Sequence, residues 1–560
     1  MASVLHPGLI LVLAGLALAT LRGRARAALA LAAPLAAIGV LLWAGEGVHW
    51  SGRFLGLAVT PYAMDALSRL FALIFAIMAF GGALFALGQS SRLELPAAFV
   101  YAGAAVGAAL AGDLLTLFVF WELMALGSTL VIWSAGTAPA WAASRRYLAV
   151  HLLGGVLLLA GIAGHVSDTG SAAFARMALD SPAHWLILAG FLVNAGAPPL
   201  SAWLPDAYPE ASWSGTVFLS AFTTKTAVYV LLRGFPGTEL LVWVGLFMVF
   251  YGIVYALLEN DMRRILAYSI VNQVGFMIAG IGIGTELALN GAAAHAFTHI
   301  LYKALLLMSA GAVLLQAGRR KCSELGGLFR TMPFTTVCGT IGALAISSFP
   351  LTSGFVSKSM ISQAAADQHL LWVWLALAAA SAGVFLHAGI KFPWFVFFQK
   401  DSGLRPAEPP LNMRLAMGLF AALCIGLGVF YQPLYALLPF KAAYVPYSGA
   451  HVVVQLELLL FSGLAFFVML PMLRRTLTIT LDFDWFYRVF AVRIAAGSGL
   501  LLAMAGAALR AAFEGAMARV RDGVQRHHGV EGLLARTWST GGMVLWVAVM
   551  LAGYLLVYYL

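Results

Sequence analysis

The chain has 560 residues, of which 62% are hydrophobic and only 10% are charged, and its mean hydropathy is +0.91. Soluble globular proteins are about half apolar and about a quarter charged, so the composition excludes a soluble protein and indicates an integral membrane protein. The net charge of +10 does not indicate nucleic acid as a partner, because the basic residues fall in short runs between apolar stretches, as expected when they set membrane orientation.

Successive apolar runs are long enough to cross a hydrocarbon core of about 30 Å as helices, which takes roughly 20 residues each. Some runs are too short to span alone, and 352–366 with 370–399 form either one interrupted segment or two, so we expect about 14–17 transmembrane helices. Periodic β signals are absent, and the predicted fold class is an all-α integral membrane protein. The runs lie near 4–21, 27–45, 62–88, 96–112, 114–134, 147–165, 184–200, 213–233, 239–258, 264–283, 287–316, 333–350, 352–366, 370–399, 412–432, 451–473, 489–509 and 540–560.

The basic residues test this division, because Lys and Arg collect in loops on the cytoplasmic side. With the N-terminus outside, the basic clusters up to residue 475 fall inside, which predicts a multi-pass protein of the inner (cytoplasmic) membrane, embedded in the lipid bilayer. Residues 510–536 carry five arginines among apolar positions and indicate an amphipathic interfacial helix before the last span. The clusters assigned to the inside are Arg22/Arg24/Arg26, Arg92, Arg145/Arg146, Arg263/Arg264, Arg319/Arg320/Lys321, Lys400/Arg405 and Arg474/Arg475.

The cysteines do not indicate a cofactor or a metal site. Cys322, Cys338 and Cys424 stand far apart with no paired spacing, which supports neither a disulfide framework nor an iron–sulfur or zinc site. We therefore expect no cofactor and no metal in this chain, and we assign any redox chemistry to a partner.

The lysines are distributed differently from the arginines. The chain has 26 Arg, nearly all at the ends of apolar runs, but only seven Lys, of which four lie within or close to such a run. A charge at mid-bilayer costs at least about 2.5–3.5 kcal/mol, and a desolvated lysine, unlike an arginine, is able to lose its proton. The pattern favours a proton relay through Lys225, Lys303, Lys358 and Lys391.

One carboxylate lies deep in an apolar run. Glu122 stands in LLTLFVFWELMALGSTLVIW, with some eight uncharged residues on each side. Such a residue normally faces the bundle interior, a partner or water, so we expect a functional group. The alternative is a static ion pair between two helices, which stabilises little once the desolvation of both charges is counted.

Titratable residues repeat at a spacing of four in GAAAHAFTHILYKALLLMSAG. His295, His299 and Lys303 are offset by about 40° from one to the next, so they lie along one stripe of a helix and are typical of a hydrogen-bonded relay. The alternatives are a metal pair, which lacks an obvious carboxylate ligand, and core histidines bonded to backbone. The same step recurs as His387 and Lys391 in LHAGIKFPWFVFF.

Proline and glycine interrupt the apolar runs at two places, residues 195–212 and residues 347–358. The first break precedes Lys225 and the second precedes Lys391. Discontinuous helices at corresponding places of two halves indicate an ion site in transporters built from inverted repeats, because irregular backbone at membrane depth must face protein or water. Ordinary loops between spans remain the alternative.

Together these residues resemble the antiporter-like family that includes subunits L, M and N of proton-pumping NADH dehydrogenase (complex I) and subunits A and D of the multisubunit Mrp-type Na+/H+ antiporters. The resemblance covers about residues 60–400 with the motifs in the same order. The matching pieces are PYAMDALSRLF, DLLTLFVFWELMALGS, PLSAWLPDAYPEAS, FTTKTAVYVLLR, NDMRRILAYSIVNQVG, GAAAHAFTHILYKALLLMSAG and FPLTSGFVSK.

The resemblance implies two inverted five-helix repeats, each with a broken helix. It places N-terminal helices at 1–95, a first repeat at 96–283, a second at 284–432 and C-terminal helices at 433–560. It also assigns roles: Glu122 and Lys225 gate the first half-channel, Arg263 lies on the central axis, His295, His299 and Lys303 join the halves, Lys391 is the exit group, and His387, Lys358 and Asp206 are secondary groups.

The sequence departs from the family at several points. The family usually has a lysine where Arg263 stands, and an arginine cannot pass a proton itself. Tyr208 stands where a histidine is usual. The ending TLTITLDFDWFYRVF and the stretch after it look more like the D-type antiporter subunits than the L subunit, because no run of amphipathic length comparable to the L subunit's long C-terminal helix is evident.

The resemblance therefore implies a proton-translocating subunit of a multisubunit cation/proton antiporter, by resemblance Na+/H+, whose partners are other antiporter-like and small hydrophobic membrane subunits. One alternative is the proton-pumping membrane subunit of a complex I-like or hydrogenase-type redox complex. Another is the membrane subunit of an inorganic-carbon uptake system, paired with a soluble zinc protein. A non-transporting scaffold is disfavoured, because an inert bundle has little reason to bear the cost of buried lysines.

Overall fold

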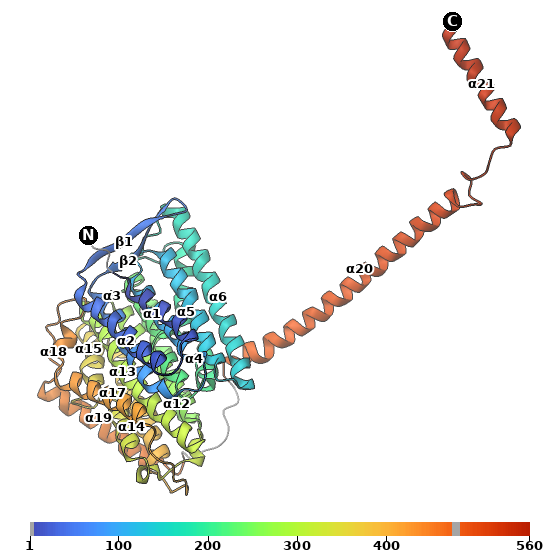
Figure 1. Cartoon of the computed structure of the whole chain (residues 1–560). Helices are drawn as coiled ribbons and strands as arrows, with labels where there is room; N and C mark the ends of the chain where they lie inside the picture. The colour runs from blue at the N-terminus through green and yellow to red at the C-terminus, as the bar shows by residue number, and fades with distance from the viewer. Residues whose placement is uncertain (1–4, 473–481) are drawn as a thin grey trace. The chain divides into compact units, whose positions relative to one another are not determined.

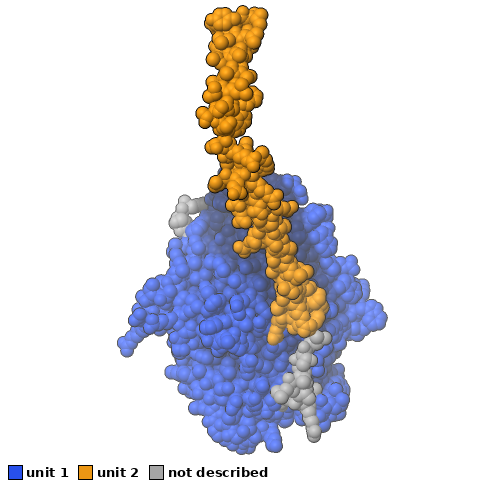
Figure 2. Space-filling view, turned by 90° about the vertical axis from the view of Figure 1, so that its right-hand side faces the viewer, with its two compact units in different colours: residues 1–484 blue, residues 485–560 orange. Residues whose placement is uncertain are grey.

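The computed structural model describes residues 5–472 and 482–560. The predicted inner cluster Arg474/Arg475 and the start of TLTITLDFDWFYRVF lie outside the described residues. The chain divides into two compact units, Met1–Asp484 and Trp485–Leu560, which are coloured separately in Figure 2.

The first unit begins with helices and a β-hairpin that was not expected from the sequence. The antiparallel strands pair from Gly47 opposite Met64 to Phe54 opposite Leu57, and the hairpin lies at one end of the bundle (Figure 1). The predicted run 62–88 therefore begins too early, because its first residues belong to a strand. The elements are α1 (Pro7–Thr20), α2 (Gly23–Trp43), β1 (Gly47–Phe54), β2 (Leu57–Met64), α3 (Ala66–Phe85) and the 3₁₀ turn η1 (Ala86–Gly88).

The next ten elements contain an interrupted helix. The predicted run 213–233 is two helices, because the chain leaves helical geometry between Leu219 and Thr223. The elements are α4 (Glu94–Leu110), α5 (Leu114–Trp133), α6 (Ala138–Thr169), α7 (Pro182–Ala195), α8 (Trp203–Ala207), η2 (Tyr208–Glu210), α9 (Gly215–Leu219), α10 (Thr223–Gly234), α11 (Leu240–Leu258) and α12 (Met262–Ile283).

The rest of the first unit contains a second break, at the place that the sequence predicted. Ser348 and Leu351 have φ of 57° and 68°, which ends α14 and allows α15 to start in a new direction. The runs 352–366 and 370–399 are separate helices. The elements are α13 (Glu286–Ala317), η3 (Cys322–Glu324), η4 (Leu328–Arg330), α14 (Pro333–Ile346), α15 (Ser353–Asp367), α16 (Leu371–Val384), the π-helical segments η5 (Phe385–Lys391) and η6 (Trp394–Phe398), α17 (Leu411–Val429), α18 (Gln432–Tyr435) and α19 (Gly449–Val468).

The second unit holds a long helix that the sequence had suggested was divided. A span at 489–509 and a separate amphipathic stretch at 510–536 were expected, but one helix of 38 residues covers residues 491–528 without a break. The predicted division between a span and a separate amphipathic helix is therefore wrong, since backbone hydrogen bonding continues where the side chains change from apolar to basic. The elements are the π-helical segment η7 (Phe486–Phe490), α20 (Ala491–His528) and α21 (Thr540–Tyr559).

The predicted all-α membrane fold is confirmed. In the part of the chain that the structure describes, thirteen helices are long and apolar enough to cross a membrane, and four shorter apolar helices accompany them. The core of the first unit lies around α12 and the α9–α10 segment. The most apolar stretch of each is fully buried. The inverted symmetry of the two repeats stays a prediction.

Candidate functional site

The row of titratable residues predicted on one stripe lies on α13, against α12. His295 Nε2 lies 3.0 Å from Gln273 Oε1, and the Lys303 ammonium donates to Ser269 Oγ at 2.9 Å. His299 stands between them, fully buried, and neither ring nitrogen has a hydrogen-bond partner among the described residues. Such buried atoms are normally bonded to ordered water, so the stripe is suited to a hydrated relay.

The Lys225 ammonium lies at the interruption between α9 and α10. It is fully buried and donates to the Ser220 carbonyl oxygen at 2.7 Å and to Thr224 Oγ1 at 3.1 Å. The last carbonyls of a helix have no partner within the helix, so the end of α9 offers an acceptor to a cation. The broken helix therefore forms part of the lysine's binding site.

Glu122 lies on α5 at a point where α6 comes unusually close. A Cβ at Gly155 would overlap the Glu122 carboxylate, so the glycine makes room for this side chain. Glu122 Oε1 is buried and has no hydrogen-bond partner among the described residues. Within the same residues Glu122 and Lys225 form no ion pair, and their pairing stays a prediction.

A chain of hydroxyl groups ends at the start of α10, and no sequence pattern had indicated it. Tyr147 on α6 donates to Ser128 Oγ at 2.9 Å and lies 3.3 Å from Thr223 Oγ1. Tyr101 on α4 lies 2.6 Å from the same Thr223 oxygen. These bonds join α4, α5 and α6 to the first residue of α10, two positions before the lysine.

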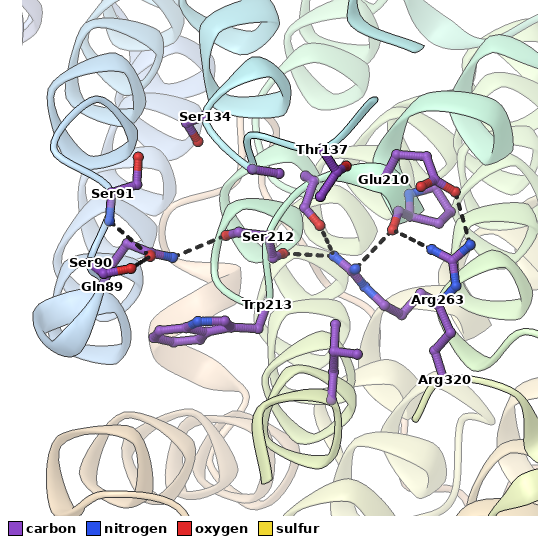
Figure 3. Close-up of a pocket in the computed structure, with 14 residues that line it drawn as sticks. Gln89, Ser90, Ser91, Ser134, Thr137, Glu210, Ser212, Trp213, Arg263 and Arg320 are labelled. Atoms are coloured by element: carbon purple, nitrogen blue, oxygen red, sulfur yellow. Dashed lines mark hydrogen bonds and ion pairs between the residues drawn. The ribbon is translucent and has the colours of Figure 1, made fainter. Parts of the chain in front are cut away.

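A pocket of about 590 Å³ lies among the loops around residues 89–91, 134–137 and 209–213, and Arg263 and Arg320 also line it (Figure 3). These loops all belong to the side predicted to face the cytoplasm. Arg320 bridges Glu210 at 3.1 Å and Asp261 at 2.8 Å on one wall. The lining comprises Gln89, Ser90, Ser91, Ser134, Ala135, Thr137, Pro209, Glu210, Ala211, Ser212, Trp213, Arg263, Leu314 and Arg320.

Arg263 lines this pocket, and its place on the central axis stays a prediction. Its guanidinium donates to the carbonyl oxygens of Pro209 at 2.8 Å, Ala211 at 2.9 Å and Ser212 at 2.7 Å, and also to Thr216 Oγ1. An arginine keeps its proton, so these four bonds suit a clamp on the segment that leads into α9.

Glu94 lies behind the same pocket, and it too was absent from the predicted site. Its carboxylate is fully buried at the start of α4 and accepts hydrogen bonds from Gln89 at 3.1 Å, Ser134 at 3.3 Å and Ser212 at 2.5 Å, and from Ser214. The only sequence signal was a carboxylate at the start of an apolar run.

Lys358 faces a second, small cavity of about 110 Å³ that Ser359, His451 and Gln455 also line. Its ammonium is buried, has no hydrogen-bond partner among the described residues and lies 4.5 Å from the centre of the Phe276 ring. A cation over an aromatic ring is stabilised, but less than one bonded to oxygens.

The remaining predicted groups have backbone or ionic partners. The Lys391 ammonium donates to the carbonyl oxygens of Ala256 at 3.0 Å, Leu257 at 2.6 Å and Glu259 at 2.6 Å, where α11 ends. His387 Nδ1 lies 2.8 Å from the Gly383 carbonyl oxygen. Asp206 is bound by both Arg146 Nε at 2.8 Å and Arg146 Nη2 at 2.9 Å, which is an arrangement typical of a structural ion pair.

Comparison with known proteins points to one family. The model of the NADH:quinone oxidoreductase/Mrp antiporter transmembrane family matches residues 111–384. The D-type subunit of the Na(+)/H(+) antiporter of Alkalihalophilus pseudofirmus is 30% identical over 350 residues, which cover 59% of this chain and 71% of that protein.

Two solved structures share the fold. A chain of the Mrp complex from Dietzia sp. DQ12-45-1b superposes with a TM-score of 0.65 at 22% identity and covers 81% of this chain and 95% of its own. A chain of the membrane-bound sulfane sulfur reductase, an archaeal respiratory membrane complex, reaches a TM-score of 0.71 at 22% identity and covers 98% of this chain and 99% of its own.

Proposed function

Because this chain belongs to the NADH:quinone oxidoreductase/Mrp antiporter transmembrane family, we propose that it conducts protons as one subunit of a multisubunit Na+/H+ antiporter. The chain is an antiporter-like membrane subunit of the kind found in Mrp and complex I-type assemblies. It lies in the inner membrane, where it assembles with other antiporter-like subunits and with small hydrophobic subunits.

The observation that carries the proposal is the set of buried basic groups along the core of the first unit. Lys225, His299 and Lys303 are fully buried on helices that pack against one another or against α12. Each buried lysine is costly, and lysine, unlike arginine, is able to exist in both charged and neutral forms. An inert bundle would gain nothing from this arrangement, whereas a proton relay requires it.

The proposed path starts at Glu122 and Lys225 and continues along the α13 stripe. A proton on Lys225 passes to the His295–His299–Lys303 row, and the exit group is Lys391 or, given its cavity, Lys358. One elementary charge moved across 100 mV gains about 2.3 kcal/mol, which is enough to bias the occupancy of such groups. Arg263 holds the entrance segment and takes no part in the transfer.

The test is purification of the tagged native protein in mild detergent, with identification of everything that accompanies it. Antiporter-like subunits and small hydrophobic proteins support the antiporter, which is then assayed by sodium-dependent collapse of a pH gradient in vesicles. A complex that holds such subunits but leaves the gradient intact with sodium would contradict the proposal. A soluble zinc protein as the main companion would indicate inorganic-carbon uptake.

A second candidate is the proton-conducting subunit of a respiratory redox complex. The observation that favours it is the extent of the likeness to the sulfane sulfur reductase chain, which covers 98% of this chain, against 81% for the Mrp chain. Iron–sulfur or flavin proteins in the purified complex would support this candidate over the antiporter.

A further inference from the structure

One face of α6 carries three residues at a spacing of four: Tyr147, His151 and Gly155. Residues four apart lie one above the other on a helix, so the three form a single row. One end of the row, Gly155, lies against the Glu122 carboxylate, and the other end, Tyr147, lies 3.3 Å from the hydroxyl of Thr223, two positions before Lys225 in the chain. His151 stands midway and is 1% exposed.

The hydrogen bond of His151 determines which ring nitrogen carries the proton. Nδ1 lies 2.9 Å from the carbonyl oxygen of Tyr147, and a carbonyl only accepts, so Nδ1 is the protonated nitrogen. Nε2 of the neutral ring is then a proton acceptor. It is buried and has no hydrogen-bond partner among the described residues.

The ring is also fixed in position. It stacks on Tyr147 with 3.9 Å between ring centroids and meets the edge of Trp203 at 4.6 Å, with the planes 80° apart. The Trp203 indole is itself bound to the Val193 carbonyl oxygen at 2.9 Å. A proton carrier needs this kind of support, because its orientation must survive a change of charge.

Other buried polar atoms around this row lack partners within the described residues. They are Glu122 Oε1 on α5 and both amide atoms of Asn194 on α7, whose oxygen lies 3.6 Å from a Cβ placed at Gly154. Buried polar atoms of this kind are normally hydrogen-bonded to ordered water. Together with His151, these two side chains surround two turns of α6 and indicate a hydrated site.

We propose that His151 carries protons between Glu122 and Lys225, which explains how two groups that form no ion pair exchange a proton. This inference rests on the proposed function. In the first step Glu122 gives its proton through water to His151 Nε2, leaving a carboxylate and an imidazolium. In the second step Nε2 gives the proton through water to the hydroxyls of Tyr147 and Thr223, and from there again through water to neutral Lys225, which regenerates the imidazole.

The test uses the whole purified complex in vesicles that contain a pH-sensitive dye. His151→Gln keeps a hydrogen-bonding side chain that binds no proton, and His151→Phe keeps an aromatic ring. Both are expected to lower proton flux at least about tenfold. His165→Gln is the matched control, because His165 lies on the same helix near its far end, paired with His184 at 3.0 Å. We expect the control to keep parental flux.

The outcomes separate this inference from the proposed function. Parental flux in either His151 variant, while Lys225→Gln abolishes flux, overturns the role of His151 and leaves the proposed function standing. Parental flux in Lys225→Gln overturns the proposed function itself. If the His151 variants fail to assemble with their companions, Tyr147→Phe replaces them, because it removes only the hydroxyl. Parental flux in Tyr147→Phe then overturns the inference, and a loss of at least about tenfold supports it.

Discussion

At the residue scale, the contacts of Arg263 indicate that it holds the backbone of a neighbouring segment. The guanidinium holds four oxygens of the segment 209–216, which leads directly into the broken helix of Lys225. A planar group with several fixed donors is needed to reach all four, and a lysine ammonium is a compact charge with three donors. Arg263 thus stabilises the backbone around it.

Arg263→Lys distinguishes a clamp from a relay. Loss of one or two buried charged hydrogen bonds is expected to cost about 1.5–3 kcal/mol each and to lower both the thermal midpoint of the purified protein and the proton flux. Arg264→Lys is the control, because Arg264 makes its ion pair with Glu259 at 2.8 Å while partly exposed. Flux that rises or stays unchanged in Arg263→Lys would show that a titratable group is preferred there.

Gly155 offers a second residue-scale prediction. In Gly155→Ala the new methyl group would meet the Glu122 carboxylate, so the carboxylate must move away from α6. We expect flux to fall several-fold although the variant folds, since an alanine in a helix is favoured over glycine by about 1 kcal/mol. Gly426→Ala, in the open surface of α17, is the control and should keep parental flux. Equal flux in both variants would mean that the position of Glu122 is unimportant.

At the element scale, Asp65 ties the start of α3 to the end of α10. Its side chain accepts from Ser68 N at 2.8 Å and from Arg233 Nη2 at 2.7 Å. Burial raises the pKa of the Asp65 carboxyl, but the Arg233 guanidinium and the Ser68 bonds hold it below its usual value. A lowered pKa in the folded state gives stability that is present at neutral pH and is lost as the pH falls through that pKa.

Substitutions of Asp65 separate the stability that comes from capping α3 from the stability that comes from the ion pair with Arg233. Asp65→Ala removes both and is expected to cost about 1 kcal/mol for the cap, with a smaller loss for a half-exposed ion pair. Asp65→Asn keeps a good capping residue, so it should lie between the parent and the alanine variant. The difference between Asp65→Asn and the parent should shrink in acid. Thermal midpoints in detergent at neutral and acidic pH measure this, and a difference that grows in acid would contradict it.

The helices were predictable because apolar length is a strong signal. The run 287–316 differs from α13 by one residue at each end. The hairpin 47–64 was not predictable, since most residues of its first strand are exposed on both faces and leave no alternation in the sequence. The π-helical segments around Lys391 were missed for another reason: a shift of backbone hydrogen bonds has no characteristic residue pattern.

The candidate site was predictable only where its residues repeat. His295, His299 and Lys303 recur at a spacing of four and were found, and the structure brings them together. His151 has no histidine or charged residue three or four positions away, and Glu94 is a single carboxylate beside Arg92, so neither produces a periodic signal. The spacing of Tyr147, His151 and Gly155 contained the information, but it becomes meaningful only when Glu122 is seen across from Gly155.

At the scale of the whole molecule, the chain consists of a bundle and a separate C-terminal unit. In the bundle, Asp482 is held by the hydroxyls of Tyr251 at 2.7 Å and Tyr268 at 2.5 Å, so the first unit is anchored almost to its end. In the second unit neither α20 nor α21 has a buried side chain. A helix as apolar as α21 needs a covering of lipid or of another protein.

Truncation after Asp484 tests the division. The bundle should keep its thermal midpoint in detergent, because the residues that bury its core all precede that point. Companion proteins should be recovered in lower yield, because the side chains of α20 and α21 are not buried within the chain and offer a surface to bind them. Full recovery of every companion by the shortened chain would assign α20 and α21 to the lipid instead.

The central claim is that buried side chains of this chain carry protons, and Lys225 tests it most directly. Lys225→Gln in the intact complex removes the charge while keeping a donor for the Ser220 carbonyl, so insertion and assembly should be unchanged. Glu122→Gln serves as the second variant. The measurement is proton flux into vesicles under an imposed membrane potential. We predict that flux is abolished in both variants with parental amounts of assembled complex, and parental flux in both would contradict the account.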